Sequence, residues 1–310
     1  MKVLLPLDGS ELAESVLEYV TELVGKMSLE FILLHVCKPN VAEMVPLHRV
    51  YIQQQIAKIT DNAKAAEKNQ GTDKEFKKVT VRGEIIVGPP AEEIIRFAEK
   101  ENVDLILMAS HGLSGIKRWA LGSIADKVLR ASNVPVWLIR PDISKEQAGQ
   151  KPSKRNLLVP LDGSRLAESV LPYVKIAAEH RGADNIGVTL LMICQAPLIT
   201  FDYSGAGIPI NKKDMAKKEC DNRKKIAQEY LDAVKARLAK SGVKAETKVL
   251  EGNPTEEIIK LANADPANLI VMATHGRTSS LGKIVYGSFG AVAQRILQEA
   301  KGPTVMIRPH

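Results

Sequence analysis

Short apolar runs alternate along the chain with longer segments in which apolar residues recur at helical spacing. In the N-terminal half, the apolar runs that predict strands are 3–7, 29–36, 76–87, 103–109 and 136–140. In the C-terminal half, they are 156–161, 186–194, 244–251, 268–274 and 304–308. Continuous apolar runs of this length are typical of parallel strands that are buried on both faces. We therefore expect an α/β fold in which helices cover both faces of a parallel sheet.

The segments between these runs predict the helices. In the N-terminal half we expect helices after Ser10, over 44–70, from Pro90 and over 123–131. A capping serine and a first-turn proline are typical signals of a helix start. Pro172 falls inside the helix expected after the first strand of the C-terminal half. A proline there removes a helical hydrogen bond and should bend that helix.

The two halves of the chain are similar in sequence. The segment 6–20 recurs as 160–174 with only two of its fifteen residues changed, and later features recur in the same order. A repeat interval of roughly 155–168 residues indicates a duplicated domain, because solenoid repeats span roughly 20–50 residues. We assign one domain to residues 1–141, a polar linker to 142–154 and a second domain to 155–310.

Composition narrows the class of protein. The chain has 310 residues, of which 45% are hydrophobic and 25% are charged, as in a globular protein. No apolar run reaches the ~18 residues of a membrane span, and the N-terminus lacks the features of a signal peptide. The three cysteines are too few and too scattered for a disulfide framework or a structural zinc site. We therefore expect a cytoplasmic protein with no membrane partner and no structural metal.

The positive charge of the chain is unevenly distributed. The net charge of +7 resides in the C-terminal half, and much of it lies between Lys212 and Lys225. Such a surface suits a nucleic acid or an anionic membrane. We favour a solvated helix face, because acidic residues are interspersed and aromatic residues that stack on bases are absent from this segment.

Small and polar residues follow the first and fourth strands of each half. In open parallel sheets, ligands bind at the carboxyl ends of strands where the strand order reverses. In the N-terminal half these ends carry Asp8-Gly9-Ser10 and Ala109-Ser110-His111-Gly112, and Gly122-Ser123 then opens a helix. Glycines admit an anion close to backbone N–H groups, and a helix N-terminus adds partial positive charge. The pattern is compatible with a phosphate-binding loop and with glycines that only form turns. It matches neither the P-loop motif GxxxxGK[ST] nor the dinucleotide-binding motif GxGxxG.

On these motifs each half resembles a universal stress protein domain, which has a five-stranded parallel sheet in the order 3-2-1-4-5. Many members of that family bind ATP or AMP through the pattern G-x2-G-x9-G-[S/T] after the fourth strand. The N-terminal half reads Ala109-x2-Gly112-x9-Gly122-Ser123, with the family's spacing. The C-terminal half reads Ala273-x2-Gly276-x10-Gly287-Ser288, with one inserted residue, and continues with Phe289-Gly290. Alanine replaces the first glycine in both halves.

The resemblance implies which residues would bind an adenine nucleotide. In the N-terminal half these are Pro6, Asp8, Val36, Met108 and Ala109 for adenine and ribose, and Gly112, Gly122, Ser123 and the N–H of Ile124 for phosphates. In the C-terminal half they are Asp162, Ile193, Met272, Ala273, Gly276, Gly287, Ser288 and Phe289.

Four side chains beside these loops have two interpretations each. Asp8 and Asp162 could coordinate a Mg²⁺ ion that bridges the phosphates of ATP, or could only shape a turn. His111 and His275 could donate to the ligand, but we favour a role in fixing the loop through hydrogen bonds.

The sequence contains no recognisable grouping of nucleophile, base and orienting partner. We therefore expect a stress-response protein that senses ATP or AMP and presents an altered surface to a protein partner, with slow hydrolysis at most. A slow ATPase or phosphotransferase is one alternative. A structural or interaction module with degenerate nucleotide sites is another.

The last predicted strand of each half would leave an exposed apolar edge of a sheet, and such edges pair with other strands. The family resemblance implies dimerisation through this strand. We expect the two last strands to pair antiparallel as an intrachain pseudo-dimer, and a homodimer of the whole chain is compatible with that arrangement.

Overall fold

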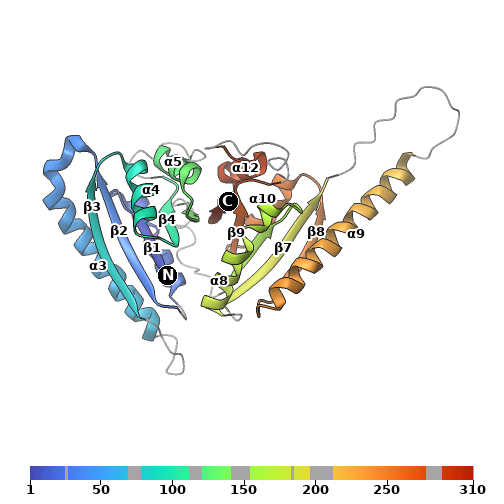
Figure 1. Cartoon of the computed structure of the whole chain (residues 1–310), viewed down its shortest axis with the longest axis horizontal. Coiled ribbons are helices and arrows are strands. Elements are labelled where there is room, and N and C mark those ends of the chain that lie inside the picture. The colour runs from blue at the N-terminus through green and yellow to red at the C-terminus, as the bar shows by residue number, and fades with distance from the viewer. Residues whose placement is uncertain are drawn as a thin grey trace.

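The computed structural model shows one continuous sheet of ten strands with helices on both faces (Figure 1). It describes residues 1–24, 27–68, 78–111, 121–140, 154–182, 185–195, 212–276 and 288–309. The strand order is β3-β2-β1-β4-β5-β10-β9-β6-β7-β8. Each half therefore has the predicted order 3-2-1-4-5, and the two halves meet at their last strands.

All ten strands overlap the predicted apolar runs. The strands and helices of the N-terminal half are β1 (Lys2–Pro6), α1 (Glu11–Glu14), α2 (Leu17–Leu23), β2 (Leu29–Cys37), the 3-10 helix η1 (Pro39–Met44), α3 (Val45–Lys68), β3 (Val79–Val87), α4 (Pro90–Lys100), β4 (Leu105–Ala109), α5 (Ser123–Ala131) and β5 (Val136–Ile139). Those of the C-terminal half are β6 (Arg155–Pro160), α7 (Arg165–Glu168), α8 (Leu171–Arg181), β7 (Ile186–Cys194), α9 (Lys212–Ala239), β8 (Glu246–Glu251), α10 (Pro254–Asn263), β9 (Asn268–Ala273), α12 (Ala291–Glu299) and β10 (Thr304–Ile307). Of the linker predicted over 142–154, only Lys154 is described.

The two halves are joined by strands β5 and β10, which pair antiparallel with Val305 opposite Trp137. The pairing expected between the two last strands is therefore present. Two arginines that directly follow these strands reinforce the contact. The Arg140 guanidinium donates to the Leu297 carbonyl, and Arg308 Nη1 donates to the Arg130 carbonyl at 3.0 Å.

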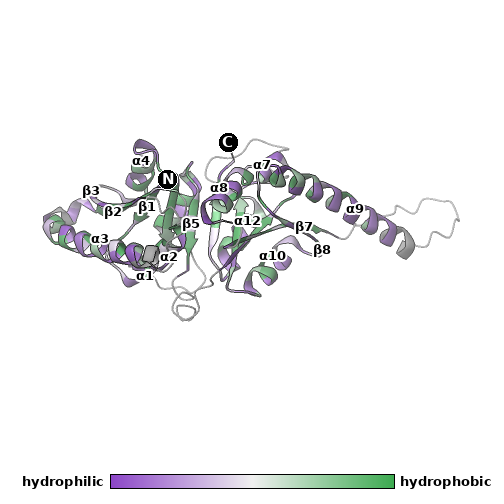
Figure 2. Ribbon diagram, turned by 90° about the horizontal axis from the view of Figure 1, so that it is seen from below, coloured by the Kyte–Doolittle hydropathy of each residue, from purple (hydrophilic) through white to green (hydrophobic). Residues whose placement is uncertain are grey.

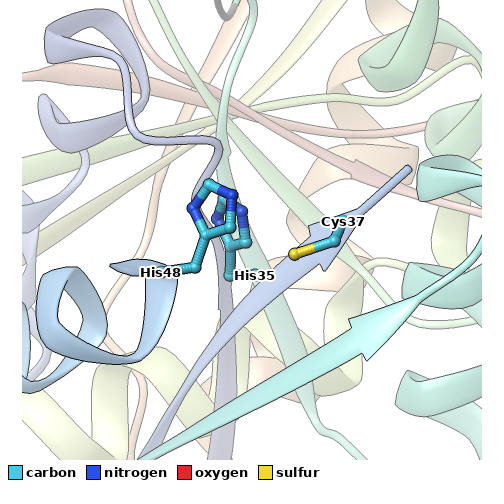
Figure 3. A group of neighbouring side chains, drawn as sticks. All are labelled: His35, Cys37 and His48. Atoms are coloured by element: carbon cyan, nitrogen blue, oxygen red, sulfur yellow. The ribbon is translucent and has the colours of Figure 1, made fainter. Parts of the chain in front are cut away.

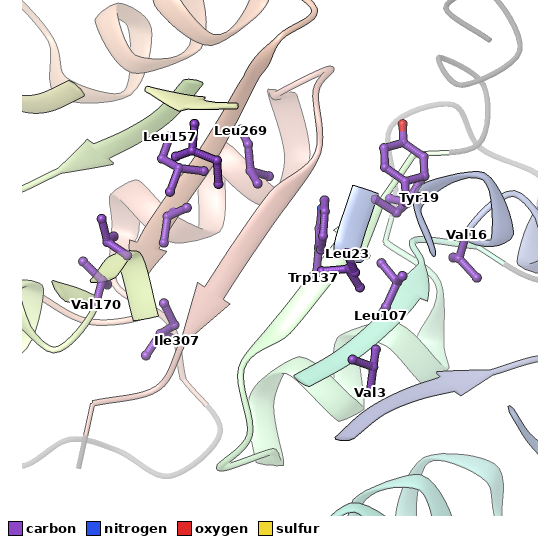
Figure 4. Packing of buried hydrophobic residues seen from close by; sticks show 14 of the residues in the cluster. Val3, Val16, Tyr19, Leu23, Leu107, Trp137, Leu157, Val170, Leu269 and Ile307 are labelled. Atoms are coloured by element: carbon purple, nitrogen blue, oxygen red, sulfur yellow. The ribbon is translucent and has the colours of Figure 1, made fainter. Parts of the chain in front are cut away.

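Two apolar layers hold the helices against the sheet. Residues of α1, α2, α3, α7, α8 and α9 pack on one face, and residues of α4, α5, α10 and α12 pack on the other. The first layer extends across the central strands, where Trp137 of the N-terminal half belongs to the same cluster as Leu157 and Leu269 of the C-terminal half (Figure 4). Hydrophobic strands lie between helices with hydrophilic outer surfaces (Figure 2). Burial on both faces explains why the strands read as continuous apolar runs.

The helix that follows the first strand is interrupted in both halves. The prediction that Pro172 would bend this helix is wrong, because the interruption does not depend on the proline. Pro172 lies in the first turn of α8, where a proline is tolerated. The N-terminal half has the same interruption between α1 and α2 without a proline. At both interruptions a serine hydroxyl donates a hydrogen bond to a backbone carbonyl of the preceding helix. Ser15 Oγ donates to the Leu12 oxygen and Ser169 Oγ to the Leu166 oxygen, each at 2.7 Å. A side chain that competes for the backbone in this way favours a break.

Helix α9 carries the basic run of the C-terminal half at one end of the sheet (Figure 1). Its charged side chains between 217 and 225 are largely exposed and form ion pairs, such as Arg223 with Glu219 at 2.7 Å and Lys224 with Glu251 at 2.7 Å. The arrangement is that of a solvated helix face. None of the helices within the described ranges is long and apolar enough to cross a membrane.

Candidate functional site

The loop after the first strand is a tight turn that caps a helix. Gly9 has a φ of +86°, which a residue with a side chain rarely adopts. Asp8 Oδ1 accepts hydrogen bonds from the Ser10 N–H at 3.0 Å and from Ser10 Oγ at 2.6 Å. Ser10 Oγ in turn accepts from the Ala13 N–H at 3.1 Å, which caps α1. One oxygen of Asp8 thus shapes the turn.

The C-terminal half repeats this turn closely. Gly163 has a φ of +83°. Asp162 Oδ1 accepts from the Ser164 N–H at 2.9 Å and from Ser164 Oγ at 2.6 Å. Both aspartates therefore shape their turns through observed hydrogen bonds. The same hydrogen bonds fix one carboxylate at the carboxyl end of β1 and one at the carboxyl end of β6.

The start of α5 lies in close contact with the end of β4. The Gly122 N–H donates to the Ser110 carbonyl at 2.8 Å. A Cβ at position 122 would lie 2.9 Å from that carbonyl oxygen, so only glycine fits without a backbone shift. Ser123 and Ile124 follow as the first residues of α5, with Ser123 exposed. Gly112, the other glycine of the predicted motif, lies outside the described residues.

In the C-terminal half the position of Gly122 is occupied by Gly290, and the predicted equivalence with Gly287 is wrong. The Gly290 N–H donates to the Thr274 carbonyl at 2.8 Å, and Gly290 is the N-cap of α12. Gly287 lies outside the described residues. The loop before α12 is thus longer than the single insertion expected. Ala291 stands where Ser123 stands in α5, so no hydroxyl opens this helix.

The residues around Gly287 have other contacts. Ser288 Oγ lies 3.3 Å from His275 Nε2. Phe289 packs under Arg130 of the N-terminal half, with the guanidinium carbon 4.6 Å from the ring centroid. A signal in the sequence identifies the correct glycine, because Gly122 and Gly290 each lie thirteen residues before the proline that precedes the last strand, Pro135 and Pro303.

The ends of β6 and β9 approach closely at Asp162 and Gly276. A Cβ at position 276 would lie 2.3 Å from Asp162 Oδ2. Glycine therefore allows the loop after β9 to pass beside the carboxylate. The structure brings together the two loops that the motifs predicted to share one site.

Both motif histidines hydrogen-bond to side chains of their own loops. His275 Nδ1 lies 2.9 Å from Thr274 Oγ1, and His111 Nδ1 lies 3.1 Å from Ser110 Oγ. Burial lowers the pKa of His275, and the positive charge of Arg308 lowers it further. These contacts match the loop-fixing role that we favoured for the histidines.

The remaining predicted residues lie at the same edge of the sheet. Pro6 ends β1, and Val36 and Ile193 lie near the ends of the second strand of each half, β2 and β7. The last two residues of each fourth strand are buried, namely Met108, Ala109, Met272 and Ala273.

Comparisons with known proteins agree with this architecture. The model of the universal stress protein family matches residues 1–140 and again residues 154–308. Universal stress protein MJ0577 of Methanocaldococcus jannaschii is 34% identical over 152 residues, which cover 45% of this chain and 94% of that protein. Universal stress protein Mb2028c of Mycobacterium bovis is 20% identical over 312 residues, which cover 99% of this chain and 96% of that protein.

A solved structure has the same overall fold. The crystal structure of a universal stress protein from Archaeoglobus fulgidus matches with a TM-score of 0.64 and 21% identity, covering 99% of this chain and 98% of that chain. Because the family model matches twice and leaves little of the sequence unmatched, the chain belongs to the universal stress protein family, as a tandem member with two copies of the domain.

Proposed function

We propose that this chain is a stress-response protein that binds one adenine nucleotide, ATP or AMP, in its N-terminal half. The observation that carries the proposal is the contact between Gly122 and Ser110, which sets the N-terminus of α5 at the end of β4. The free N–H groups of a helix start and its partial positive charge favour a phosphate group.

The neighbouring residues would complete this site. Ser123 would donate its hydroxyl to a phosphate oxygen, and the Asp8 carboxylate would contact the ribose or hold a Mg²⁺ ion bound to the phosphates. Pro6, Val36, Met108 and Ala109 would line the adenine and ribose. These assignments rest on the family motif and on the position of the residues at one sheet edge.

The C-terminal half would bind nucleotide more weakly. Its helix α12 begins with Ala291, so the serine hydroxyl of the motif is missing there. Thirteen residues separate Gly276 from Gly290, whereas nine separate Gly112 from Gly122, so the spacing of the motif is not kept in this half. We therefore expect about one nucleotide per chain.

We expect the bound nucleotide to act as a signal. His111 and His275 hydrogen-bond to side chains of their own loops, which suits a role in holding those loops. Nucleotide binding would order the glycine loop, and a protein partner would recognise the altered surface. Hydrolysis would be slow at most.

Matched charge substitutions at the two helix starts test this proposal. Ser123 and Ala291 are the first residues of α5 and α12, and both are exposed. A glutamate at either position suits the helix dipole, so the fold should persist. Ser123→Glu should weaken ATP binding at least about fivefold, because like charges a few ångström apart repel by about 1–4 kcal/mol. Ala291→Glu should have little effect.

The measurement is calorimetric titration of the full chain with ATP, AMP and adenosine. Adenosine lacks phosphates, so its affinity should be similar in both variants. Thermal shift gives an independent readout, since ligand at about a hundredfold over its dissociation constant stabilises the fold by about 2.7 kcal/mol. Absence of any adenylate binding by the wild-type chain would refute the proposal, and a larger effect of Ala291→Glu would move the site to the C-terminal half.

A further inference from the structure

Three metal-ligating side chains gather on the face of the sheet that α3 covers. His35 and Cys37 lie on β2, and His48 lies near the start of α3 (Figure 3). One ring nitrogen of each histidine and the Cys37 sulfur all lie within 4.8 Å of one another. Alternate residues of a strand point to the same face, so His35 and Cys37 project to the face opposite Val36, which is packed with α4 and α5.

A hydrogen bond to the backbone fixes the His35 ring and selects its tautomer. Its ring is buried, and Nδ1 lies 2.8 Å from the Leu7 carbonyl oxygen. A carbonyl oxygen can only accept, so Nδ1 carries the hydrogen and Nε2 keeps its lone pair. A ligand histidine almost always donates its other nitrogen to a carbonyl or a carboxylate in this manner.

The other two residues complete a donor set from two elements. The His48 ring stacks on the His35 ring, with centroids 4.1 Å apart and an angle of 27° between planes. His48 is half-buried, so this residue is accessible to solvent. The Cys37 thiol is buried, and its sulfur points towards the two rings (Figure 3).

We propose that His35, Cys37 and His48 bind a late transition-metal ion such as Zn²⁺, with a water molecule as the fourth ligand. Two imidazole nitrogens and one thiolate suit zinc and related ions and not the hard ions Mg²⁺ and Ca²⁺. In a tetrahedral zinc site, bonds of about 2.0–2.3 Å set the ligand atoms roughly 3.3–3.8 Å apart. On binding the ion, the half-buried His48 would move so that the ligand atoms close from their present spacing to that range. The thiol proton leaves to solvent as the Cys37 sulfur coordinates the ion.

The C-terminal half provides an internal control. Cys194 ends β7 as Cys37 ends β2, and it is also buried. The position of His35 is taken there by Met192, and helix α9 contains no histidine. The duplicated fold therefore offers the same cysteine without its two histidine neighbours.

Metal titration of the full chain tests the site. The reduced, metal-free protein is titrated with Co²⁺, which reports a thiolate ligand through a sulfur-to-cobalt charge-transfer absorption, and Zn²⁺ is then added to displace it. We expect one equivalent of Co²⁺ to produce this absorption. Cys37→Ser should abolish it, and Cys194→Ser should retain it. His48→Ala should weaken Zn²⁺ binding by more than about 10–100-fold, the loss that follows when only a hydrogen-bond partner of a ligand is removed.

The outcomes separate the proposal from adventitious binding. No charge-transfer absorption in the wild-type chain would overturn it, as would an absorption that survives Cys37→Ser or that disappears with Cys194→Ser. Circular dichroism checks that the variants fold. Should Cys37→Ser prove unfolded, the half-buried His48 carries the test alone, and wild-type Zn²⁺ affinity in His48→Ala would refute the site. Neither result depends on nucleotide binding.

Discussion

Glu22 of the N-terminal half and Arg155 of the C-terminal half form a bidentate ion pair. Arg155 Nη2 lies 2.7 Å from Glu22 Oε1, and Arg155 Nε lies 2.8 Å from Glu22 Oε2. The two side chains are only 10% and 8% exposed. Arg155 Nη1 also donates to the Pro266 carbonyl at 2.8 Å, and the guanidinium packs against the Tyr19 ring. The contact between the two halves is therefore polar as well as apolar.

Removal of the Glu22 charge should destabilise the whole chain. Glu22→Gln leaves the buried guanidinium of Arg155 without its counter-charge, which costs about 3–5 kcal/mol. A double variant, Glu22→Leu with Arg155→Met, should be more stable than Glu22→Gln, because it removes both charges. Urea unfolding gives the free energies.

The exposed pair of Lys175 and Glu179, 3.7 Å apart, is the control for this experiment. Glu179→Gln should change the free energy of unfolding by only about 0–1 kcal/mol, since solvent screens surface pairs. Equal losses in Glu22→Gln and Glu179→Gln would show that the pair between the halves contributes no more than a surface contact.

His180 should make the contact between the halves sensitive to acid. Its Nδ1 accepts from the Met27 N–H at 3.0 Å, and its Nε2 faces the Leu23 carbonyl as a donor, so both nitrogens are satisfied only in the neutral ring. Burial lowers the pKa of His180 below the ordinary value of 6.5, and the charges of Arg181 and the N-terminal ammonium add to this, although the Leu23 carbonyl opposes it. The folded chain therefore takes up a proton there less readily than the unfolded chain.

Acid should therefore lower the free energy of unfolding. The stability that neutral His180 contributes is complete above about pH 6.5 and is lost as the pH falls below that value towards the folded pKa. The slope is up to about 1.4 kcal/mol per pH unit for this residue. Burial also lowers the pKa values of His35 and His275, so they contribute in the same direction. In urea unfolding between about pH 8 and pH 5, His180→Gln should show a shallower slope than the wild type. Identical slopes would contradict this role.

The strands could be predicted because their signal is local. A strand buried on both faces must be apolar at nearly every position, and β7 (Ile186–Cys194) and β2 (Leu29–Cys37) read that way directly. The antiparallel pairing of β5 and β10 followed from their exposed edges and the family resemblance. The ends of strands were predicted less accurately, because Leu105 begins β4 two residues after the predicted start.

The errors arose where contacts distant in sequence decide the structure. Gly287-Ser288 matches the motif in letters, but the carbonyl of Thr274 selects Gly290 as the helix start. The number and the spacing of the cysteines in the sequence do not predict the cluster of His35, Cys37 and His48. Only the packing of α3 on β2 brings His48 to the other two residues.

The close approach of Gly276 to Asp162 supports a final prediction about the loop after β9. In Gly276→Ala, the new Cβ would lie 2.3 Å from Asp162 Oδ2, so the carboxylate must move. Movement would disturb the hydrogen bonds that Asp162 Oδ1 accepts from Ser164, whose Oγ caps α7 by accepting from the Ala167 N–H. We expect a loss of about 1–3 kcal/mol in the free energy of unfolding, as for other overpacked sites.

Gly302→Ala is the matched control for Gly276→Ala. A Cβ at position 302 would lie 3.6 Å from the Asn268 carbonyl oxygen, an ordinary contact, so this variant should be neutral or more stable by about 0.4–1 kcal/mol. A double variant, Gly276→Ala with Asp162→Ala, should lose less than the sum of the single losses, because removal of the carboxylate relieves the clash. Strict additivity in this cycle, measured by urea unfolding, would show that the two residues do not meet in solution.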